Sequence, residues 1–441
     1  MQLLLHILFT LASFVLCLAL LKKWSVVRLS GIRYKTVRLV FVLKVAAGFA
    51  LWAIYTFHYS YRETSDAFRY FDDAMVLFNT LKDSPTIYFQ FLFGIGLDDP
   101  ALTPIFDQLR GWSSSYSYGI ANDNPTIIRL NMLIALFSQG FYHVHTVVFG
   151  FLSTVGVMAF VRGAYALGNI SFHKTLAFLS VALMPTVLFW GSGVLKEAPL
   201  IAGIGMFLWS LTNLLKKQWR FVFWTALSVL FLANLKPYVL ITMLPAVIAF
   251  LLGKVVLKQR LVWLRYTLVV VVSYVGAVFA ARVYSPGGML YILAKKQQDF
   301  YNVATANNAG STVEIAPVDQ SFFGFLMDVP ERLWLAFMRP TLSEVEGAFY
   351  WPPMLESSML FILFVVVIFR FRIVRKELLT NELFCFSLTF IIVLGTVIGS
   401  CVPVLGAVVR YRLPGVLFAA LLVPLTLFVY PVLNRWIADR F

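Results

Sequence analysis

The chain is dominated by a succession of apolar segments, each close to the length needed to cross a lipid bilayer. A helix needs roughly 20 apolar residues to cross a hydrocarbon core about 30 Å thick. Only 13% of the 441 residues are charged, about half the proportion usual in soluble domains. The sequence therefore predicts an all-α, polytopic transmembrane helix bundle that forms one integral-membrane domain over residues 1–441. We expect eleven spans, at about residues 1–21, 39–57, 142–161, 174–190, 198–214, 221–235, 238–253, 266–282, 355–370, 384–402 and 413–431.

The distribution of charge predicts the orientation of this bundle. The first apolar segment has no positive charge before it and is followed by six Lys and Arg in residues 22–38, which favours a retained helix over a cleaved signal peptide. With the N-terminus outside, the inner segments hold 21 Lys and Arg and three acids, and the outer segments hold fourteen and eighteen. We therefore expect a multi-pass protein of the cell inner (plasma) membrane with a cytoplasmic C-terminus.

Single charges and cysteines fit the same interpretation. Lys44, near the inner end of the second span, is expected to extend its ammonium group to the membrane surface. The net charge of +15 resides mainly in the inner segments, so membrane lipid is an expected partner and nucleic acid is not. Cys17, Cys385 and Cys401 lie in or beside apolar segments without paired spacing, so neither a disulfide framework nor a zinc site is indicated.

Two long outer loops, residues 58–126 and 283–354, are predicted between spans. The first includes GWSSSYSYGIANDNP, which is typical of irregular coil. Loops of this length are usually functional or disordered. Residues 127–138 are apolar as well, and we interpret them as an interfacial or re-entrant helix that leads into the next span.

The stretch Tyr59–Leu81 at the start of the first outer loop has helical periodicity, and Ser65 or Thr64 is positioned to cap the helix. A helix of this kind lies in the membrane surface with its apolar side in lipid and its carboxylates towards water. The apolar face consists of Phe68, Phe71, Met75, Phe78 and Leu81. The polar face consists of Asp66, Arg69, Tyr70 and Asp73.

Three charged clusters are predicted at the outer ends of spans, where charge is costly unless it faces a cavity or a polar ligand. Lys196 and Glu197 lie where one helix is expected to end and another to begin, so free N–H groups would add to an anion site there. Lys236 and Tyr238 flank a turn between two spans. The third cluster, Arg410-Tyr411-Arg412, precedes the last span.

This pattern favours transfer of a sugar from a lipid-linked phosphate. Such a transfer needs fixed cations for the leaving phosphate and a base for the acceptor hydroxyl. The cations are Lys196, Lys236, Arg410 and Arg412, because ammonium and forked guanidinium groups bind phosphate oxygens. Asp66 is the expected base, and Asp73 stays open as an alternative. Other expected substrate contacts are Arg69, Tyr70, Glu197 and Tyr238.

No cofactor is required by the spacing of the polar residues. Asp98, Asp99 and Asp123 could bind a divalent cation, although nothing in their arrangement demands one. His143 and His145 are two residues apart and lie on nearly opposite sides of a helix, which is unsuited to metal ligation.

The arrangement resembles the GT-C superfamily of integral-membrane glycosyltransferases, which includes protein O-mannosyltransferases and aminoarabinose transferases. The resemblance rests on the long outer loop with Asp66 and Tyr70 in a D-x-x-x-Y arrangement, and on basic groups near later span ends. It implies a polyprenyl-phosphate-linked sugar as donor and a glycan, lipid or protein as acceptor. It also implies that Asp66 is the catalytic base.

Three alternatives stay open at the level of sequence. An O-antigen-type polysaccharide polymerase or ligase would depend on Arg410 and Arg412 more than on Asp66. A polysaccharide or lipid transporter or flippase would place its charges near the bilayer midplane, often in repeated halves. A purely structural membrane protein would use none of these groups chemically.

Overall fold

The computed structural model describes residues 2–24, 27, 31–58, 62, 65–113, 123–168, 173–255, 261–280, 288–306, 309–345, 347 and 350–427. Within these residues all regular structure is helical, apart from one antiparallel bridge between Thr312 and Val404, so the all-α prediction is confirmed. Thr64, Tyr59, most of the predicted coil GWSSSYSYGIANDNP and the last residues, 428–441, lie outside the described residues.

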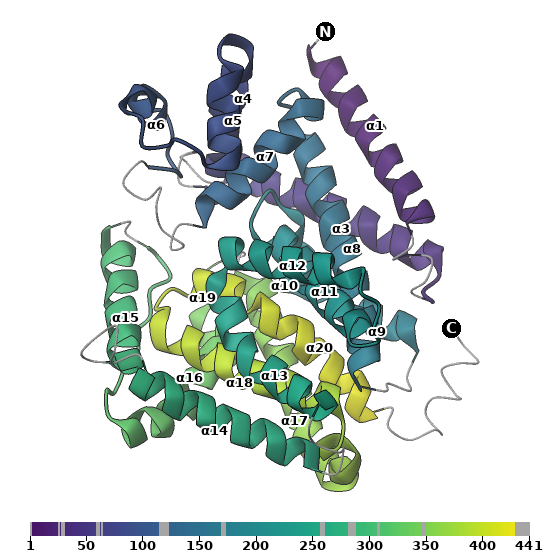
Figure 1. Ribbon diagram of the computed structural model, residues 1–441, viewed down its shortest axis with the longest axis vertical. Helices are drawn as coiled ribbons and strands as arrows, with labels where there is room; N and C mark the ends of the chain where they lie inside the picture. The colour runs from purple at the N-terminus through teal and green to yellow at the C-terminus, as the bar shows by residue number, and fades with distance from the viewer. Residues whose placement is uncertain are drawn as a thin grey trace. The chain divides into compact units, whose positions relative to one another are not determined.

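The chain divides into two compact units (Figure 1). Unit 1 comprises Met1–Gly163 and Val187–Leu240, and unit 2 comprises Ala164–Thr186 and Ile241–Phe441. Three helices pass from one unit into the other along the chain: α8 (Tyr142–Gly168), α10 (Pro185–Phe189) and α13 (Pro237–Val255).

Unit 1 is built around the contact of α4 with α5 and α7 and the contact of α11 with α12. Its helices are α1 (Gln2–Lys23), α3 (Tyr34–Phe57), α4 (Asp66–Asp83), α5 (Pro85–Phe93), η2 (Pro100–Leu102), α6 (Thr103–Phe106), α7 (Asn124–Ser138), η4 (Trp190–Ser192), α11 (Glu197–Leu214) and α12 (Phe221–Leu235).

Unit 2 is centred on α18, against which α14, α15, α16 and α20 pack. Its helices are α9 (Lys174–Ala182), α14 (Val262–Ala280), α15 (Gly288–Ala306), α16 (Phe322–Met338), η7 (Leu342–Glu344), α17 (Trp351–Leu379), α18 (Glu382–Cys401), α19 (Leu405–Tyr411) and α20 (Leu413–Leu427).

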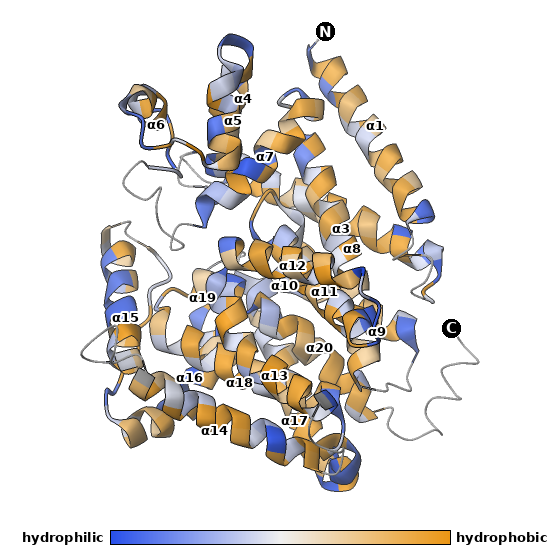
Figure 2. Ribbon diagram, viewed as in Figure 1, coloured by the Kyte–Doolittle hydropathy of each residue, from blue (hydrophilic) through white to orange (hydrophobic). Residues whose placement is uncertain are grey.

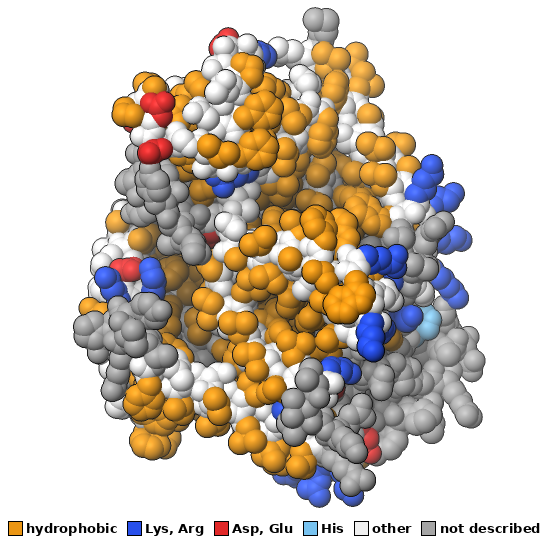
Figure 3. Space-filling model, in the orientation of Figure 1, with side chains coloured by type: hydrophobic (Ala, Val, Ile, Leu, Met, Phe, Trp, Pro, Cys, Tyr) orange, Lys and Arg blue, Asp and Glu red, His pale blue; other side chains and the backbone are white. Residues whose placement is uncertain are grey.

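Seven described helices are long and apolar enough to cross a membrane: α1, α3, α8, α13, α14, α17 and α18. The number rises to nine if two bent pairs, α9 with residues 185–192 and α19 with α20, each count as one span. Hydrophobic residues run along these helices (Figure 2), and hydrophobic side chains cover much of the visible surface (Figure 3). Exposed apolar side chains on these helices include Leu3, Val272 and Ile362. These features support a multi-pass membrane protein.

The two other predicted spans correspond to α11 and to the shorter apolar helix α12. The total of eleven spans stays a prediction. The predicted interfacial or re-entrant segment, residues 127–138, forms most of α7, which packs against α4.

The prediction of an amphipathic helix after Ser65 is confirmed, because α4 begins at Asp66 with Ser65 in the N-cap position. The expectation that its apolar face lies in lipid is wrong. Phe68 and Phe71 are 1% and 6% exposed and belong to the hydrophobic core of unit 1, with Met75, Phe78 and Leu81 packed against that core. The reason is that α5, α7 and Tyr142 cover this face of α4.

Lys44 also differs from its predicted position at the membrane surface. Its side chain is fully buried, and its ammonium group donates a 2.7 Å hydrogen bond to the carbonyl of Val187. One and two turns further along α3, Gly48 and Leu51 pack against η4 and Gly193 so closely that a Cβ on Gly48 would clash with the Ser192 carbonyl. Helix α3 thus fixes the backbone that leads into α11.

Helices α8 and α11 approach each other through small residues. A Cβ on Gly205 would clash with the backbone of Gly156, and a Cβ on Gly156 would clash with the backbone of Ala202. Close backbone approach through small residues is a usual way for membrane helices to associate. This contact places α11, and therefore the residues at its N-terminus.

We predict that Gly205→Leu lowers the apparent melting temperature of the purified protein by about 5 °C or more, because overpacking of a close helix contact typically costs about 1–3 kcal/mol. The control is Gly276→Leu on α14, where an added Cβ meets no heavy atom within 4 Å. Equal melting temperatures for the two variants would contradict the importance of this contact.

Candidate functional site

Three segments that are distant in sequence meet at the carboxylate of Asp123 in unit 1. The Lys196 ammonium lies 2.5 Å from Oδ1 of Asp123, and the Lys236 ammonium lies 3.5 Å from Oδ2. The side chains of Lys196 and Lys236 are only 5% and 7% exposed, whereas that of Asp123 is 26% exposed. In this ion network the two lysines are therefore buried, whereas the carboxylate is partly accessible to solvent.

Helix ends position each of these side chains. Asp123 is the N-cap residue of α7, and Asn124 and Pro125 begin the helix. Proline is common in the first turn of a helix, because its fixed φ suits that position. Lys196 is the N-cap residue of α11. Lys236 is the C-cap residue of α12, with φ −154° and ψ 78°, outside the α region that the following proline disfavours.

A chain of hydrogen bonds connects Lys196 to α4. The Lys196 ammonium donates to Oδ1 of Asn124 at 2.6 Å, and Nδ2 of Asn124 donates to the Gly111 carbonyl at 2.8 Å. The backbone N–H groups of Gly111 and Arg110 then donate to the two oxygens of Asp73, at 2.7 and 2.9 Å. Both oxygens of Asp73 accept hydrogen bonds, so Asp73 fixes the loop at Gly111, whose carbonyl is the partner of Asn124.

Asp66 and Tyr70 lie one turn apart on α4 and face the same lysine. The Lys196 ammonium is 5.1 Å from the centre of the Tyr70 ring, within range of a cation–π contact. Asp66 is close enough for its negative charge to raise the pKa of Lys196. The structure thus brings the predicted residues Asp66, Tyr70, Lys196 and Lys236 together in unit 1.

The charges of the network influence one another's ionisation. Burial lowers the pKa of Lys196 to about 8, although Asp123 and Asp66 act in the opposite direction. Burial also opposes ionisation of Asp123, but the charges of Lys196 and Lys236 hold its pKa below the usual value. Asp123 is therefore ionised at neutral pH, and Lys196 is close to its titration point.

Three further predicted residues accompany this network. Glu197 is 1% exposed in the first turn of α11, and the Tyr238 ring centre lies 5.8 Å from the Lys236 ammonium. Burial raises the pKa of Asp73 above its usual value, and the positive charge of the nearby Arg69 offsets part of that rise.

Arg410 and Arg412 belong to unit 2. The Arg412 side chain is fully buried and donates to Glu356 at 2.9 Å, to the Arg339 carbonyl at 2.7 Å and to Ser357 Oγ at 3.0 Å. Its guanidinium group is engaged inside unit 2. Arg410, at the end of α19, is partly exposed.

Sequence reasoning missed the central role of Asp123 and Asn124. The sequence indicates only a possible role for Asp123 as a ligand of a divalent cation, and it predicts no role for Asn124. Their one local signal is the Asp-Asn-Pro sequence, which marks a helix start. Among the described residues, no group of three or more His, Cys, Asp or Glu side chains is arranged to hold a metal ion.

A second polar cluster in unit 1 has the geometry of a nucleophile and base. Ser138 Oγ lies 2.8 Å from Nε2 of His145, and Nδ1 of His145 lies 2.7 Å from Oδ1 of Asn131. All three side chains are fully buried. Because all three side chains are buried, we interpret this cluster as a structural link between α7 and α8.

Comparison of the chain with protein-family models, with curated proteins and with solved structures finds no match. The assignment of the chain as a membrane protein therefore rests on its apolar helices, and any activity is a proposal from the chemistry of the site.

We predict that Arg412→Met destabilises the protein, because removal of one member of a buried ion pair costs roughly 3–5 kcal/mol. The apparent melting temperature of purified protein should fall by on the order of 10 °C. The matched control is Arg372→Met, at an exposed position on α17. A normal melting temperature for Arg412→Met would show that the pair with Glu356 does not hold unit 2 together.

Proposed function

We propose that the protein is a membrane glycosyltransferase that moves a sugar from a polyprenyl-phosphate carrier to an acceptor on the extracytoplasmic face of the membrane. The observation that carries the proposal is the convergence of Lys196, Lys236 and Asp66 on one partly accessible site of unit 1. Two cations beside a carboxylate are the groups that this reaction needs.

Lys196 retains capacity for a phosphate. An ammonium group has three N–H donors, and in the described residues Asp123 and Asn124 accept from two of those of Lys196. A phosphate that approaches from the accessible side of Asp123 would accept the third and neutralise part of the buried positive charge. The N-terminus of α11, which begins at Glu197, adds a favourable helix dipole.

In the proposed reaction, the Asp66 carboxylate accepts the proton of an acceptor hydroxyl. The hydroxyl oxygen attacks the anomeric carbon of the sugar, and the bond between that carbon and the phosphate oxygen breaks. The electron pair of this bond passes to the phosphate, and the lysines stabilise the resulting charge. The products are the glycosylated acceptor, with inverted anomeric configuration, and polyprenyl phosphate.

Asp66 is a better candidate for the base than Asp73. Both oxygens of Asp73 accept backbone N–H groups, so protonation of Asp73 would break the loop that it holds. The proposal includes the predicted topology of eleven spans with the N-terminus outside the cell. In that topology the first two spans, α1 and α3, return the chain to the extracytoplasmic side, where α4 begins. It involves no divalent cation.

We predict that Asp66→Asn reduces sugar transfer from polyprenyl-phosphate donors at least about 100-fold, the usual lower limit for loss of a general base. Binding of polyprenyl phosphate should change little. The control is Asp83→Asn, at an exposed position at the end of the same helix. The assay measures release of polyprenyl phosphate from a panel of lipid-linked sugars.

Two measurements, sugar transfer by variants and transport in vesicles, separate this function from its alternatives. Activity that survives Asp66→Asn but is lost on Arg410→Ala would favour a polysaccharide polymerase or ligase. Transport or flipping in reconstituted vesicles without sugar transfer would favour a transporter.

We predict that binding of polyprenyl phosphate weakens as the pH rises through about 8, because Lys196 loses its proton there. Between about pH 7 and pH 10 the phosphate stays doubly charged, so the lysine determines the profile. Asp123→Asn removes a charge that raises the pKa of Lys196, so the profile should move to lower pH. An unchanged profile in Asp123→Asn would show that Lys196 does not bind the phosphate.

A further inference from the structure

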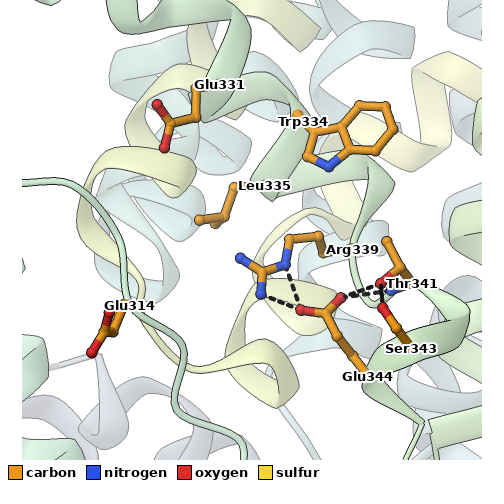
Figure 4. Close-up of a pocket in the computed structure, with 8 residues that line it drawn as sticks. All are labelled: Glu314, Glu331, Trp334, Leu335, Arg339, Thr341, Ser343 and Glu344. Carbon is orange, nitrogen blue, oxygen red and sulfur yellow. Dashed lines mark hydrogen bonds and ion pairs between the residues drawn. The ribbon is translucent and has the colours of Figure 1, made fainter.

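Unit 2 contains a cavity that the site in unit 1 does not use. Its volume is about 330 Å³, at the lower end of the roughly 300–1,000 Å³ range of small-molecule sites. The walls are the C-terminal half of α16, the residues that follow it up to Glu344, and the extended segment around Glu314 (Figure 4). The volume suits one monosaccharide-sized group.

The wall after α16 is held by an ion pair. Two nitrogens of Arg339, Nε and Nη2, donate to Oε1 of Glu344. The other oxygen of Glu344 accepts from the backbone N–H and the hydroxyl of Thr341, at 2.7 and 2.8 Å. Glu344 is thus fully engaged in shaping the wall, as Figure 4 shows, and it neutralises the charge of Arg339.

Both sides of the cavity are anchored to the segment that carries Arg410-Tyr411-Arg412. The Arg339 carbonyl accepts hydrogen bonds from Arg412 and Ser357, at 2.7 and 2.8 Å. On the Glu314 side, the Val313 N–H donates to the Pro403 carbonyl at 2.7 Å, directly before α19. The cavity is therefore a built feature and does not arise from loose packing of loops.

The groups that remain available are two carboxylates and an aromatic ring. Glu314 and Glu331 are exposed, and within the described residues neither carboxylate has a recorded hydrogen bond or ion pair. Trp334 is 49% exposed, and the edge contact of its ring with Phe361 restrains it. The hydroxyls of Thr341 and Ser343 lie 3.0 Å apart at the rim.

We infer that this cavity binds a saccharide without acidic groups, and that, if the proposed function is correct, this saccharide is part of the acceptor. Carboxylates accept strong hydrogen bonds from the hydroxyl or amino groups of a sugar. An indole ring offers a large, rigid apolar surface to the C–H face of a pyranose. The excess of carboxylates repels phosphates and uronic acids, and the described acids do not form a metal site.

The test measures binding of three oligosaccharides of equal length to the full-length protein in lipid nanodiscs by calorimetry. The first is neutral, the second carries amino groups and the third carries uronic acids. The first two should bind, and the third should bind at least about tenfold more weakly. Butylamine, a cation without a sugar, should not bind. Comparable binding of butylamine or of the uronic acid oligosaccharide would overturn the inference.

Variants locate the binding. Trp334→Ala should weaken binding of the neutral oligosaccharide by between about twofold and twelvefold. The matched control is Trp351→Ala, whose side chain is 48% exposed and lies outside the cavity. Glu331→Gln should also weaken binding, whereas Glu377→Gln, at an exposed position on α17, should not. Equal effects in each variant and its control would overturn the inference.

The outcome is distinguishable from failure of the proposed function. Binding is measured without donor, so a protein that binds saccharide but transfers no sugar retains this inference and loses the proposed function. If sugar transfer proceeds and Trp334→Ala leaves the KM for the acceptor unchanged, the proposed function survives and this inference fails.

Discussion

The arrangement of unit 1 depends on one carboxylate that is shared by two buried cations. A lysine ammonium group that is removed from water needs a counter-charge, and Lys196 and Lys236 find the same one in Asp123. Because each lysine ends or begins a helix, this sharing fixes the ends of α7, α11 and α12 around one point. Without Asp123, two cations would repel each other in an apolar environment. The helix ends are therefore held by charge as well as by packing.

Buried ion pairs also hold unit 2, but they differ in accessibility. Arg412 and Glu356 are both fully buried, and the pair of Arg265 with Glu382 is nearly so. The guanidinium group of Arg412 donates to Glu356, Ser357 and backbone carbonyls. Glu382 accepts hydrogen bonds from Arg265 and Tyr266. Because both of its side chains are fully buried, the Arg412–Glu356 pair is closed to a ligand. Asp123 is 26% exposed and pairs with two buried lysines, and for this reason we place the candidate site there.

Sequence reasoning predicted the features that depend on neighbouring residues. The periodicity after Ser65 predicted the start of α4, and the expected helix junction at Lys196 and Glu197 predicted the start of α11. The pairing of Asp123 with two lysines could not be predicted, because no local pattern records which distant helix ends meet. The environment of α4 was mistaken for the same reason. Its apolar face looks the same whether lipid or α7 covers it.

The role of Arg412 could not be predicted from its neighbours in the sequence either. A forked guanidinium group near a span end is typical both of phosphate sites and of internal ion pairs, and its sequence neighbours do not distinguish the two. Its partner Glu356 lies 56 positions away in the chain. In the structure, the segment Arg410-Tyr411-Arg412 supports a wall of the cavity in unit 2, because Arg412 donates a hydrogen bond to the Arg339 carbonyl.

The most direct test of the central claim is an experimental structure of the protein with a short-chain polyprenyl phosphate. The account predicts that the phosphate lies within hydrogen-bond distance of the Lys196 and Lys236 ammonium groups, beside Asp66 and Tyr70. A phosphate bound elsewhere, with Asp123 still bridging both lysines, would contradict it.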